Sequence, residues 1–142
     1  MGLFAKLFKK KVQLSEEELK WNKMWELWSD GELEQPISSL LTYEGEIQNG
    51  GHLQFFCNIE EDEENKIDDV LKELKKILPK EHYNNLNSAY KEYQKLNFEP
   101  ETSEVYCEVA IEEPLLEYDN FYYEHEEEIQ NILKEYSLKI EL

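Results

Sequence analysis

Three histidines are the side chains of this sequence best suited to hold a metal ion, and one of them is flanked by acids. Glu124 and His125 each precede Glu128 by about one helical turn, and His52 and His82 could converge on them from elsewhere in the chain. The sequence contains neither an H-E-x-x-H motif nor a cysteine–histidine spacing typical of zinc sites. The solvated face of an acidic helix accounts for these acids more simply, so no metal site is predicted.

Other reaction chemistries find no better support. The acids from Glu60 to Glu64 lack the glycine and the alternation of a calcium-binding EF-hand loop, and Gly50-Gly51 lacks the spacing of a phosphate-binding loop. Carboxylates are too numerous to indicate a general acid and base, which need a sheltered pair with separated pKa values. Cys57 and Cys107 are expected to be reduced, buried small hydrophobes, with a disulfide or a reactive thiol as the alternative. We predict a non-enzymatic protein without catalytic residues, metal or cofactor.

Net charge limits the partners that can approach this chain. The 142 residues carry 33 acids against 15 lysines, with no arginine, and the formal net charge is −18. Residues 1–11 hold four of the lysines and no acid, so the remainder has 33 acids, 11 lysines and a net charge of −22. Such a field repels nucleic acid and attracts basic protein surfaces. The expected partner is therefore a basic protein, and direct nucleic-acid binding is excluded.

The N-terminal segment differs from the rest. Leu3, Phe4, Leu7 and Phe8 fall on one helical face with lysines elsewhere, which is typical of a short interfacial helix with weak contact to an anionic membrane surface. The alternatives are a helix docked on the protein's own acidic body, or a frayed tail. The segment has no apolar run of signal-peptide length, and a cytoplasmic location is expected. We predict two parts: a basic amphipathic arm over residues 1–11 and a single acidic helical domain over residues 12–142.

Apolar periodicity predicts an all-α, compact single-domain helical bundle with at most one short strand pair. A capping box at Ser15 opens the first predicted helix. Its three tryptophans, at 21, 25 and 28, are expected in the core rather than in a partner groove or a base-stacking platform. The predicted helices cover residues 15–29, 36–49, 52–57, 67–78, 81–96 and 120–136, with one turn at 114–118. Residues 104–111 are rich in β-branched side chains and could form a short strand or a turn-helix segment.

One segment carries a recognisable motif, Glu46-Ile-Gln-Asn-Gly-Gly-His-Leu-Gln-Phe-Phe-Cys-Asn58. It resembles the E-x-x-N-G-G-x-x-Q-[FY]-F-x-N signature of a bacterial family of unknown function that includes a neisserial DNA-mimic protein. The matching residues are Glu46, Asn49, Gly50, Gly51, Gln54, Phe55, Phe56 and Asn58. Over residues 15–137 the order of the predicted elements is also similar to that of this family. It implies a mostly helical single domain without known catalysis and, for one branch, a homodimer that occupies the DNA-binding face of a transcription factor.

The motif itself has a physical interpretation that is structural. Asn49 and the two glycines suit a helix–helix corner, the two phenylalanines suit its core, and Gln54 and Asn58 can satisfy backbone groups. The alternative is a polar pocket built by Glu46, Asn49, His52 and Gln54.

Function is therefore assigned to the charge. Residues 99–142 hold 14 acids and two lysines, a net charge of −12. About 30 Å of B-DNA carries roughly 18 phosphates, about half on one face, so one protein face of this acidity can match that density. The predicted partner-binding residues are Glu60, Glu61, Asp62, Glu63, Glu64, Glu112, Glu113, Glu117, Asp119, Glu124, Glu127 and Glu128. We predict an acidic interaction protein of the DNA-mimic type that binds a basic DNA-binding regulator. The alternatives are a helical accessory or immunity-type domain whose acidity only confers solubility and, second, a metal-dependent enzyme.

Overall fold

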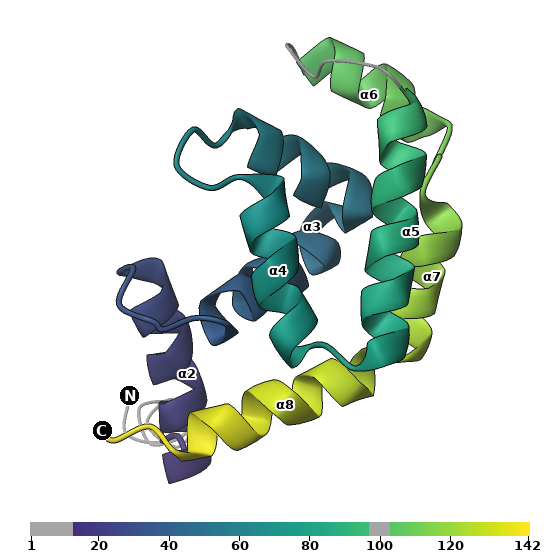
Figure 1. The fold of residues 1–142 in the computed structure, drawn as a ribbon. Coiled ribbons are helices and arrows are strands. Elements are labelled where there is room, and N and C mark those ends of the chain that lie inside the picture. The colour runs from purple at the N-terminus through teal and green to yellow at the C-terminus, as the bar shows by residue number, and fades with distance from the viewer. Residues whose placement is uncertain (1–12, 97–102) are drawn as a thin grey trace, which may run out of the picture. The chain divides into compact units, whose positions relative to one another are not determined.

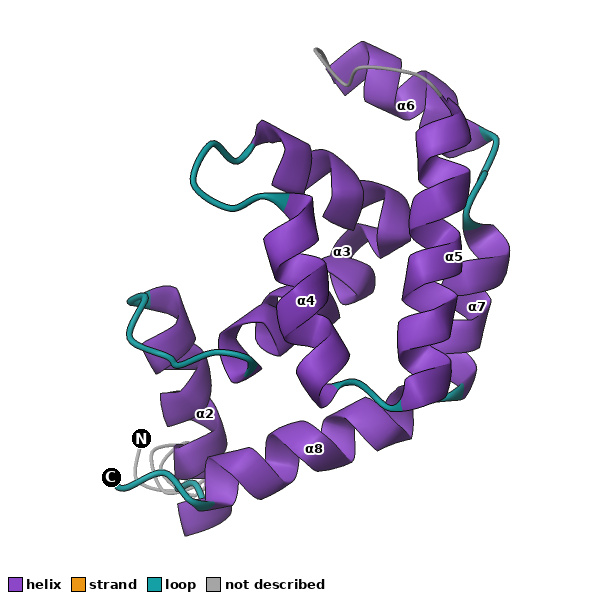
Figure 2. Cartoon of the chain, in the orientation of Figure 1, coloured by secondary structure: helices purple, strands orange, loops and turns teal. Residues whose placement is uncertain are grey.

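The computed structural model describes residues 13–96 and 103–142, and their regular structure is entirely helical (Figure 1, Figure 2). These residues form α2 (Glu16–Ser29), α3 (Ile37–Glu61), α4 (Ile67–Ile77), α5 (Lys80–Leu96), α6 (Ser103–Ile111), α7 (Leu116–Glu124) and α8 (Glu126–Leu138). No strand occurs in the described ranges, which confirms the all-α class. The predicted basic arm, residues 1–11, lies outside them. The chain divides into two compact units, a terminal unit of residues 1–33 with 131–142 and a central unit of residues 34–130.

In the terminal unit, helix α2 begins and ends where its sequence predicts. The Ser15 hydroxyl accepts a hydrogen bond from the Glu18 amide at 3.2 Å, so one orphan donor of the first turn is satisfied. After the last turn Gly31 adopts φ +72, the left-handed conformation that closes a helix. Lys20 donates to the Leu138 carbonyl at 3.0 Å, which places a cation at the end of α8, whose last turn has no basic residue.

The three tryptophans of α2 are less buried than a core position requires. Trp21, Trp25 and Trp28 are each partly exposed, whereas Met24 on the same helix is fully buried. Trp25 and Trp28 meet edge to face, with ring centroids 5.6 Å apart. A tryptophan is too large to be covered completely by a single neighbouring helix, while the slimmer methionine fits between turns.

The central unit is organised around α3, which contacts α4, α5 and α7, while α5 also contacts α4 and α7 (Figure 1). Aromatic rings fill the middle: Tyr43 stands edge to face with Phe55 at 5.0 Å and with Tyr122 at 5.6 Å. Such pairs add specific geometry to a large buried apolar area. Aliphatic side chains are also fully buried here, among them Leu40, Leu41, Ile47, Leu74, Leu86 and Ile129.

Residues 104–111 form helix α6, so of the two open alternatives the helical one holds, because β-branched preference is weak and depends on a neighbouring strand to pair with. One local prediction needs correction. The predicted last helix, 120–136, is divided at His125 into α7 and α8. His125 leaves helical geometry (φ −119, ψ 16), and its amide donates to the carbonyls of Phe121 and Tyr122, which closes α7. No helix in the described ranges combines the length and the apolar character needed to cross a bilayer.

Candidate functional site

The motif segment forms a sharp corner within α3. Gly51 has φ +78 and ψ −172, a conformation that only glycine adopts readily, and it separates two helical halves of α3. The carboxylate of Asp119, on α7, lies directly against this glycine, and a Cβ at position 51 would overlap its Oδ2. Glycine is therefore needed here both for its backbone conformation and for the close approach of α7.

Asp119 is held by the residue that follows the corner. Its Oδ1 accepts two hydrogen bonds from His52, from the backbone amide at 2.8 Å and from ring Nδ1 at 2.6 Å. On the other side of the ring, His52 Nε2 lies 2.7 Å from the Tyr43 hydroxyl. A carboxylate can only accept, so Nδ1 carries a proton, and a neutral ring then accepts from the tyrosine through Nε2. Burial, and secondly the charge of Asp119, raise the pKa of Tyr43 well above its ordinary range, so Tyr43 keeps its proton and donates.

The order hydroxyl–imidazole–carboxylate is the order of groups in a catalytic triad, but its placement here rules out that use. Tyr43 and His52 are both 0% exposed, so no substrate reaches the hydroxyl. These contacts instead tie the two halves of α3 to α7. Tyr123 of α7 adds to this connection by donating to the Ile47 carbonyl at 2.9 Å. We call Tyr43, Gly51, His52 and Asp119 the corner network.

Other motif side chains interlock on the outer side of the corner. Glu46 Oε2 accepts from Gln54 Nε2 at 2.9 Å and from Asn58 Nδ2 at 2.7 Å. A Cβ at Gly50 would overlap the Gln54 side chain, so the first glycine also permits a close contact. Gln54 and Asn58 thus bond to a side chain rather than to the backbone groups that the sequence suggests.

The polar pocket considered as an alternative is not assembled. His52 is turned into the core towards Tyr43, Gln54 is bonded to Glu46, and Asn49 is exposed. Glu46 and Gln54 therefore contact each other, while His52 and Asn49 lie apart from them, so the four side chains do not line one pocket.

The histidines weighed as metal ligands are only partly brought together. His82 and His125 have ring centroids 6.2 Å apart, and His82 Nε2 lies 2.8 Å from the His125 carbonyl and 3.3 Å from a Glu128 oxygen. Burial lowers the pKa of His82, which favours its neutral form. His52 belongs to the corner network instead. Within the described ranges, no group of three histidine, cysteine or acidic side chains has the arrangement of a metal site.

The two cysteines differ in environment. Cys57 is buried as expected, and its thiol lies 3.8 Å from the Tyr93 hydroxyl. Cys107 is exposed on α6, contrary to the prediction of two buried thiols. Helix α6 has no buried residue among its described side chains, which a local sequence window does not reveal. Both are free thiols.

The predicted partner-binding acids occupy two separate places in the central unit. The first five, residues 60–64, cover the end of α3 and the loop to α4, not the start of a helix. Asp62 organises this loop by accepting from the Glu64 amide at 2.9 Å and from the Asn65 side chain at 2.9 Å, and these bonds lower its pKa. Glu60 accepts from the Tyr93 hydroxyl at 2.7 Å.

The other predicted acids follow the turn after α6, helix α7 and the start of α8. Figure 1 places α7 and the α3–α4 loop on different sides of the central unit, so the two sets do not join into one surface. Of the second set, Glu112, Glu113, Glu117, Glu124, Glu127 and Glu128 are exposed. Asp119 is the exception, because its side chain is 22% exposed and bonded to His52.

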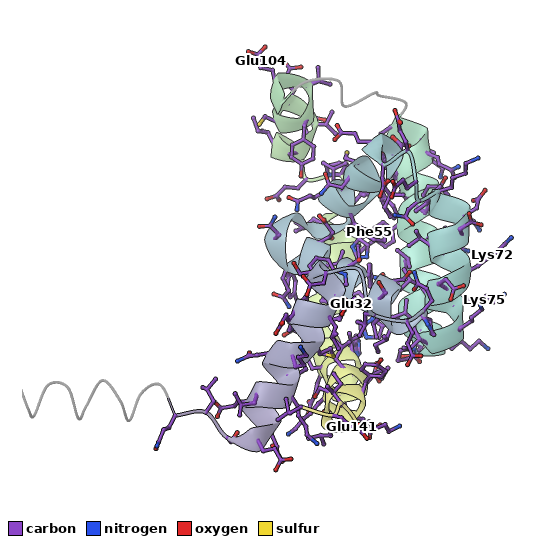
Figure 3. All side chains as sticks on the ribbon, turned by 90° about the vertical axis from the view of Figure 1, so that its left-hand side faces the viewer. Glu32, Phe55, Lys72, Lys75, Glu104 and Glu141 are labelled. Atoms are coloured by element: carbon purple, nitrogen blue, oxygen red, sulfur yellow. The ribbon has the colours of Figure 1, made fainter. Side chains whose placement is uncertain are left out.

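Exposed lysines of the central unit lie mostly on α4 and α5. Helix α4 carries Lys72, Lys75 and Lys76, and Figure 3 shows Lys72 and Lys75 directed outward on one side of the central unit. Lys76 pairs with Glu73 at 3.0 Å. Helix α5, which contacts α7, carries three more, whereas α7 itself has acids and no lysine.

The structural role of Asp119 in the corner network is not predictable from the sequence. Asp119 and His52 are 67 residues apart, and in the sequence Asp119 is one acid among many. The one hint in the sequence is His52, directly after the two glycines, because a histidine needs a polar partner once it is buried.

Comparison with known proteins identifies one family. Residues 31–140 match the family described as DMP19-like protein, and this range includes the corner, α7 and all of α8. It is not a known enzyme family. No curated protein and no solved structure shows a significant match. The match covers well over half of the 142 residues, so the chain belongs to the DMP19-like protein family.

Proposed function

We propose that this protein is a non-enzymatic interaction protein that binds a basic, DNA-binding protein through an acidic surface, and that it does so as a DNA mimic. We define the acidic surface as residues 112–128. Membership of the DMP19-like family and the resemblance of the motif to that of a DNA-mimic protein both support this proposal.

The observation that carries the proposal is the composition of the acidic surface. Residues 112–128 contain eight acids and no lysine. Most of these carboxylates are exposed, and they follow a continuous path along α7 into α8. A stretch with many acids and no lysine of its own draws a positively charged partner towards it and helps to fix its orientation.

The charge density of this stretch is comparable with that of a duplex face. Residues 116–128 would extend over about 20 Å at the helical rise of about 1.5 Å per residue. About 20 Å of B-DNA holds roughly 12 phosphates, of which about six face one side. Residues 116–128 supply six acids, of which four are exposed, so a protein surface built to bind DNA meets negative charge of the same order.

The proposal is tested by neutralising charges on the two acidic places separately. The first variant carries Glu112→Gln, Glu124→Gln and Glu127→Gln. Its matched control changes the same number of exposed acids in the α3–α4 region, with Glu61→Gln, Glu63→Gln and Glu64→Gln. Both variants lose three negative charges, so any difference between them reflects position and not net charge.

The measurement is capture of protein from a lysate of the native cell at low and high salt, with identification of the captured protein. We expect a DNA-binding protein that is retained at low salt and released at high salt, because exposed charges are screened beyond about 8 Å at physiological ionic strength. The first variant should lose this capture and the control should keep most of it. Capture unaffected by salt, or equal in both variants, would instead favour an accessory domain whose acidity serves solubility.

Two other predictions about partners stay open to the same experiments. A homodimer is expected from the resemblance, and sedimentation of the purified protein measures it. Weak contact of residues 1–11 with anionic membranes is measured with vesicles and a variant without these residues.

A further inference from the structure

A cavity of about 210 Å³ lies in the central unit between the corner of α3, helix α6 and the start of α7. Its lining is apolar and polar in similar parts, and the apolar part includes Leu53, Ala110, Pro114 and Leu115. The polar side chains in the lining are those of Asp119, Tyr106 and Glu113. No lysine is among the described residues that line it. The cavity therefore combines apolar surface with two acidic side chains.

The carboxylate in this cavity is already positioned by the corner network. Asp119 Oδ1 accepts both hydrogen bonds from His52, which fix the side chain against the core. Asp119 Oδ2 has no hydrogen-bond partner among the described residues. An acceptor that is fixed in place and has an unused oxygen binds a cation without first losing conformational freedom. A cation at Oδ2 would also offset the charge of this largely buried carboxylate.

The size of the cavity and the single unbonded oxygen of Asp119 limit which side chain can bind in it. Pockets for drug-sized ligands measure about 300–1,000 Å³, so a cavity of about 210 Å³ suits one side chain rather than a cofactor. Arginine is best held by a carboxylate that offers both oxygens to its planar fork, whereas lysine needs only one acceptor for a compact ammonium. The four-carbon stem of lysine also matches the apolar wall.

The surface around the mouth indicates a protein as the source of that side chain. Leu116 lines the cavity and is 43% exposed, and Ile111, next to Ala110, is 80% exposed. Exposed aliphatic side chains beside a pocket are typical of protein contact surfaces, which surround a central anchor with apolar neighbours.

We propose that this cavity receives one lysine side chain of a basic partner protein, with its ammonium at Asp119 Oδ2 and its stem along the apolar wall. This inference rests on the proposed function, because it takes the partner to be a basic protein, and it adds a specific anchoring contact to a surface that otherwise attracts by charge alone.

The first test uses the wild-type protein and small probes. N-acetyl-lysine methylamide is titrated while the His52 and Leu53 amides are followed by ¹H–¹⁵N NMR, since the His52 amide donates to Asp119. We expect saturable shifts with a dissociation constant in the millimolar range, on the order of what a few atoms provide. The arginine analogue should bind several-fold more weakly. The norleucine analogue, which has the stem without the charge, should cause no saturable shift. Absence of a lysine response, or an equal response to norleucine, would overturn the proposal.

The second test fills the cavity. Ala110→Leu adds volume to its wall without touching the corner network, and Cys107→Leu makes a similar change at an exposed position of the same helix, outside the cavity. We expect Ala110→Leu to abolish the chemical-shift changes caused by the lysine analogue and to weaken binding of the captured partner at least tenfold. Cys107→Leu should change neither the shifts nor the binding. If the lysine shifts disappear but partner binding is unaffected, the occupant is a free amine and the proposal of a partner lysine is wrong. If the acidic surface captures no partner, the proposed function is wrong, but the NMR titration still tests lysine binding in the cavity.

Discussion

Replacing Gly51 with alanine tests the corner more directly than any other single change. The new Cβ meets two obstacles, a backbone with φ +78 that disfavours any residue but glycine and the Asp119 carboxylate that occupies the space. Since Asp119 is bonded to His52 through Oδ1, it cannot move away without loss of those bonds. The substitution therefore acts on α3 and α7 together.

The expected magnitude follows from these two contributions. A non-glycine residue in this backbone region costs about 1–3 kcal/mol. Weakening the hydrogen bonds to a charged acceptor costs about 1.5–3 kcal/mol more. The sum, about 2.5–6 kcal/mol, is a large part of the 5–15 kcal/mol that is typical of a folded protein. With a urea dependence of about 2 kcal/mol per M, the midpoint of unfolding should fall by about 1.3–3 M.

The assay must report on the central unit. All three tryptophans belong to α2 in the terminal unit, so urea unfolding of Gly51→Ala is followed by far-ultraviolet circular dichroism, with tryptophan fluorescence as a separate signal for the other unit. Gly31→Ala is the control. Gly31 also has positive φ, but a Cβ there meets no atom within 4 Å, so it should cost only about 1 kcal/mol.

A double-mutant cycle separates the two contributions. In an Asp119→Ala background the overlap is absent, and Gly51→Ala should then cost only its backbone contribution. The reasoning is refuted if Gly51→Ala is no more destabilising than Gly31→Ala, or if its cost is the same with and without Asp119.

Three further predictions concern buried groups. Tyr43→Phe leaves His52 Nε2 without its partner and should lower the free energy of unfolding by about 1–3 kcal/mol in urea titrations. A change below about 0.5 kcal/mol would contradict the stabilising role of the corner network. Burial raises the pKa of Glu44, so the contribution of this side chain to stability is present at low pH and is lost as pH rises through the raised pKa. Glu44→Gln should therefore be more stable than wild type at pH 7, and this difference should vanish in acid. A stability difference that stays constant across a pH series would be inconsistent with this cause. Burial raises the pKa of Cys57 to about 11, so iodoacetamide at pH 8 should modify Cys107 alone in the folded protein and both thiols in urea. Mass spectrometry counts the modified thiols. Modification of Cys57 under native conditions would show that solvent reaches its side chain.

The helices were largely predictable because their signals are local. Ser15 and Gly31 delimit α2, and Gly50-Gly51 predicted a break in α3, since capping and positive φ depend on a few neighbouring residues. The division at His125 was not predicted, because the apolar spacing continues through it and only the amide contacts of the folded chain show where α7 closes. Residues 104–111 were ambiguous because β-branched side chains suit both a strand and a short helix without tertiary context.

The candidate site was predictable in composition but not in arrangement. The excess of acids after residue 112 is evident from the sequence, and so is the acidic run at 60–64. That these lie on different sides of the central unit depends on how α3 and α7 pack. Asp119 illustrates the limit best: a contact between residues 67 apart carries no local pattern, and its bond to His52 was found only from the structure.

The most direct test of the proposed function measures competition with DNA. The captured DNA-binding protein is saturated with a fluorescently labelled duplex of its own site, and this protein is added while anisotropy is recorded. As a DNA mimic it should release the duplex with a saturable, stoichiometric fall in anisotropy, and the variant with Glu112→Gln, Glu124→Gln and Glu127→Gln should release it at least tenfold less effectively. If anisotropy instead rises because the duplex and this protein bind the partner together, the acidic surface does not occupy the DNA-binding face and the proposed function is wrong.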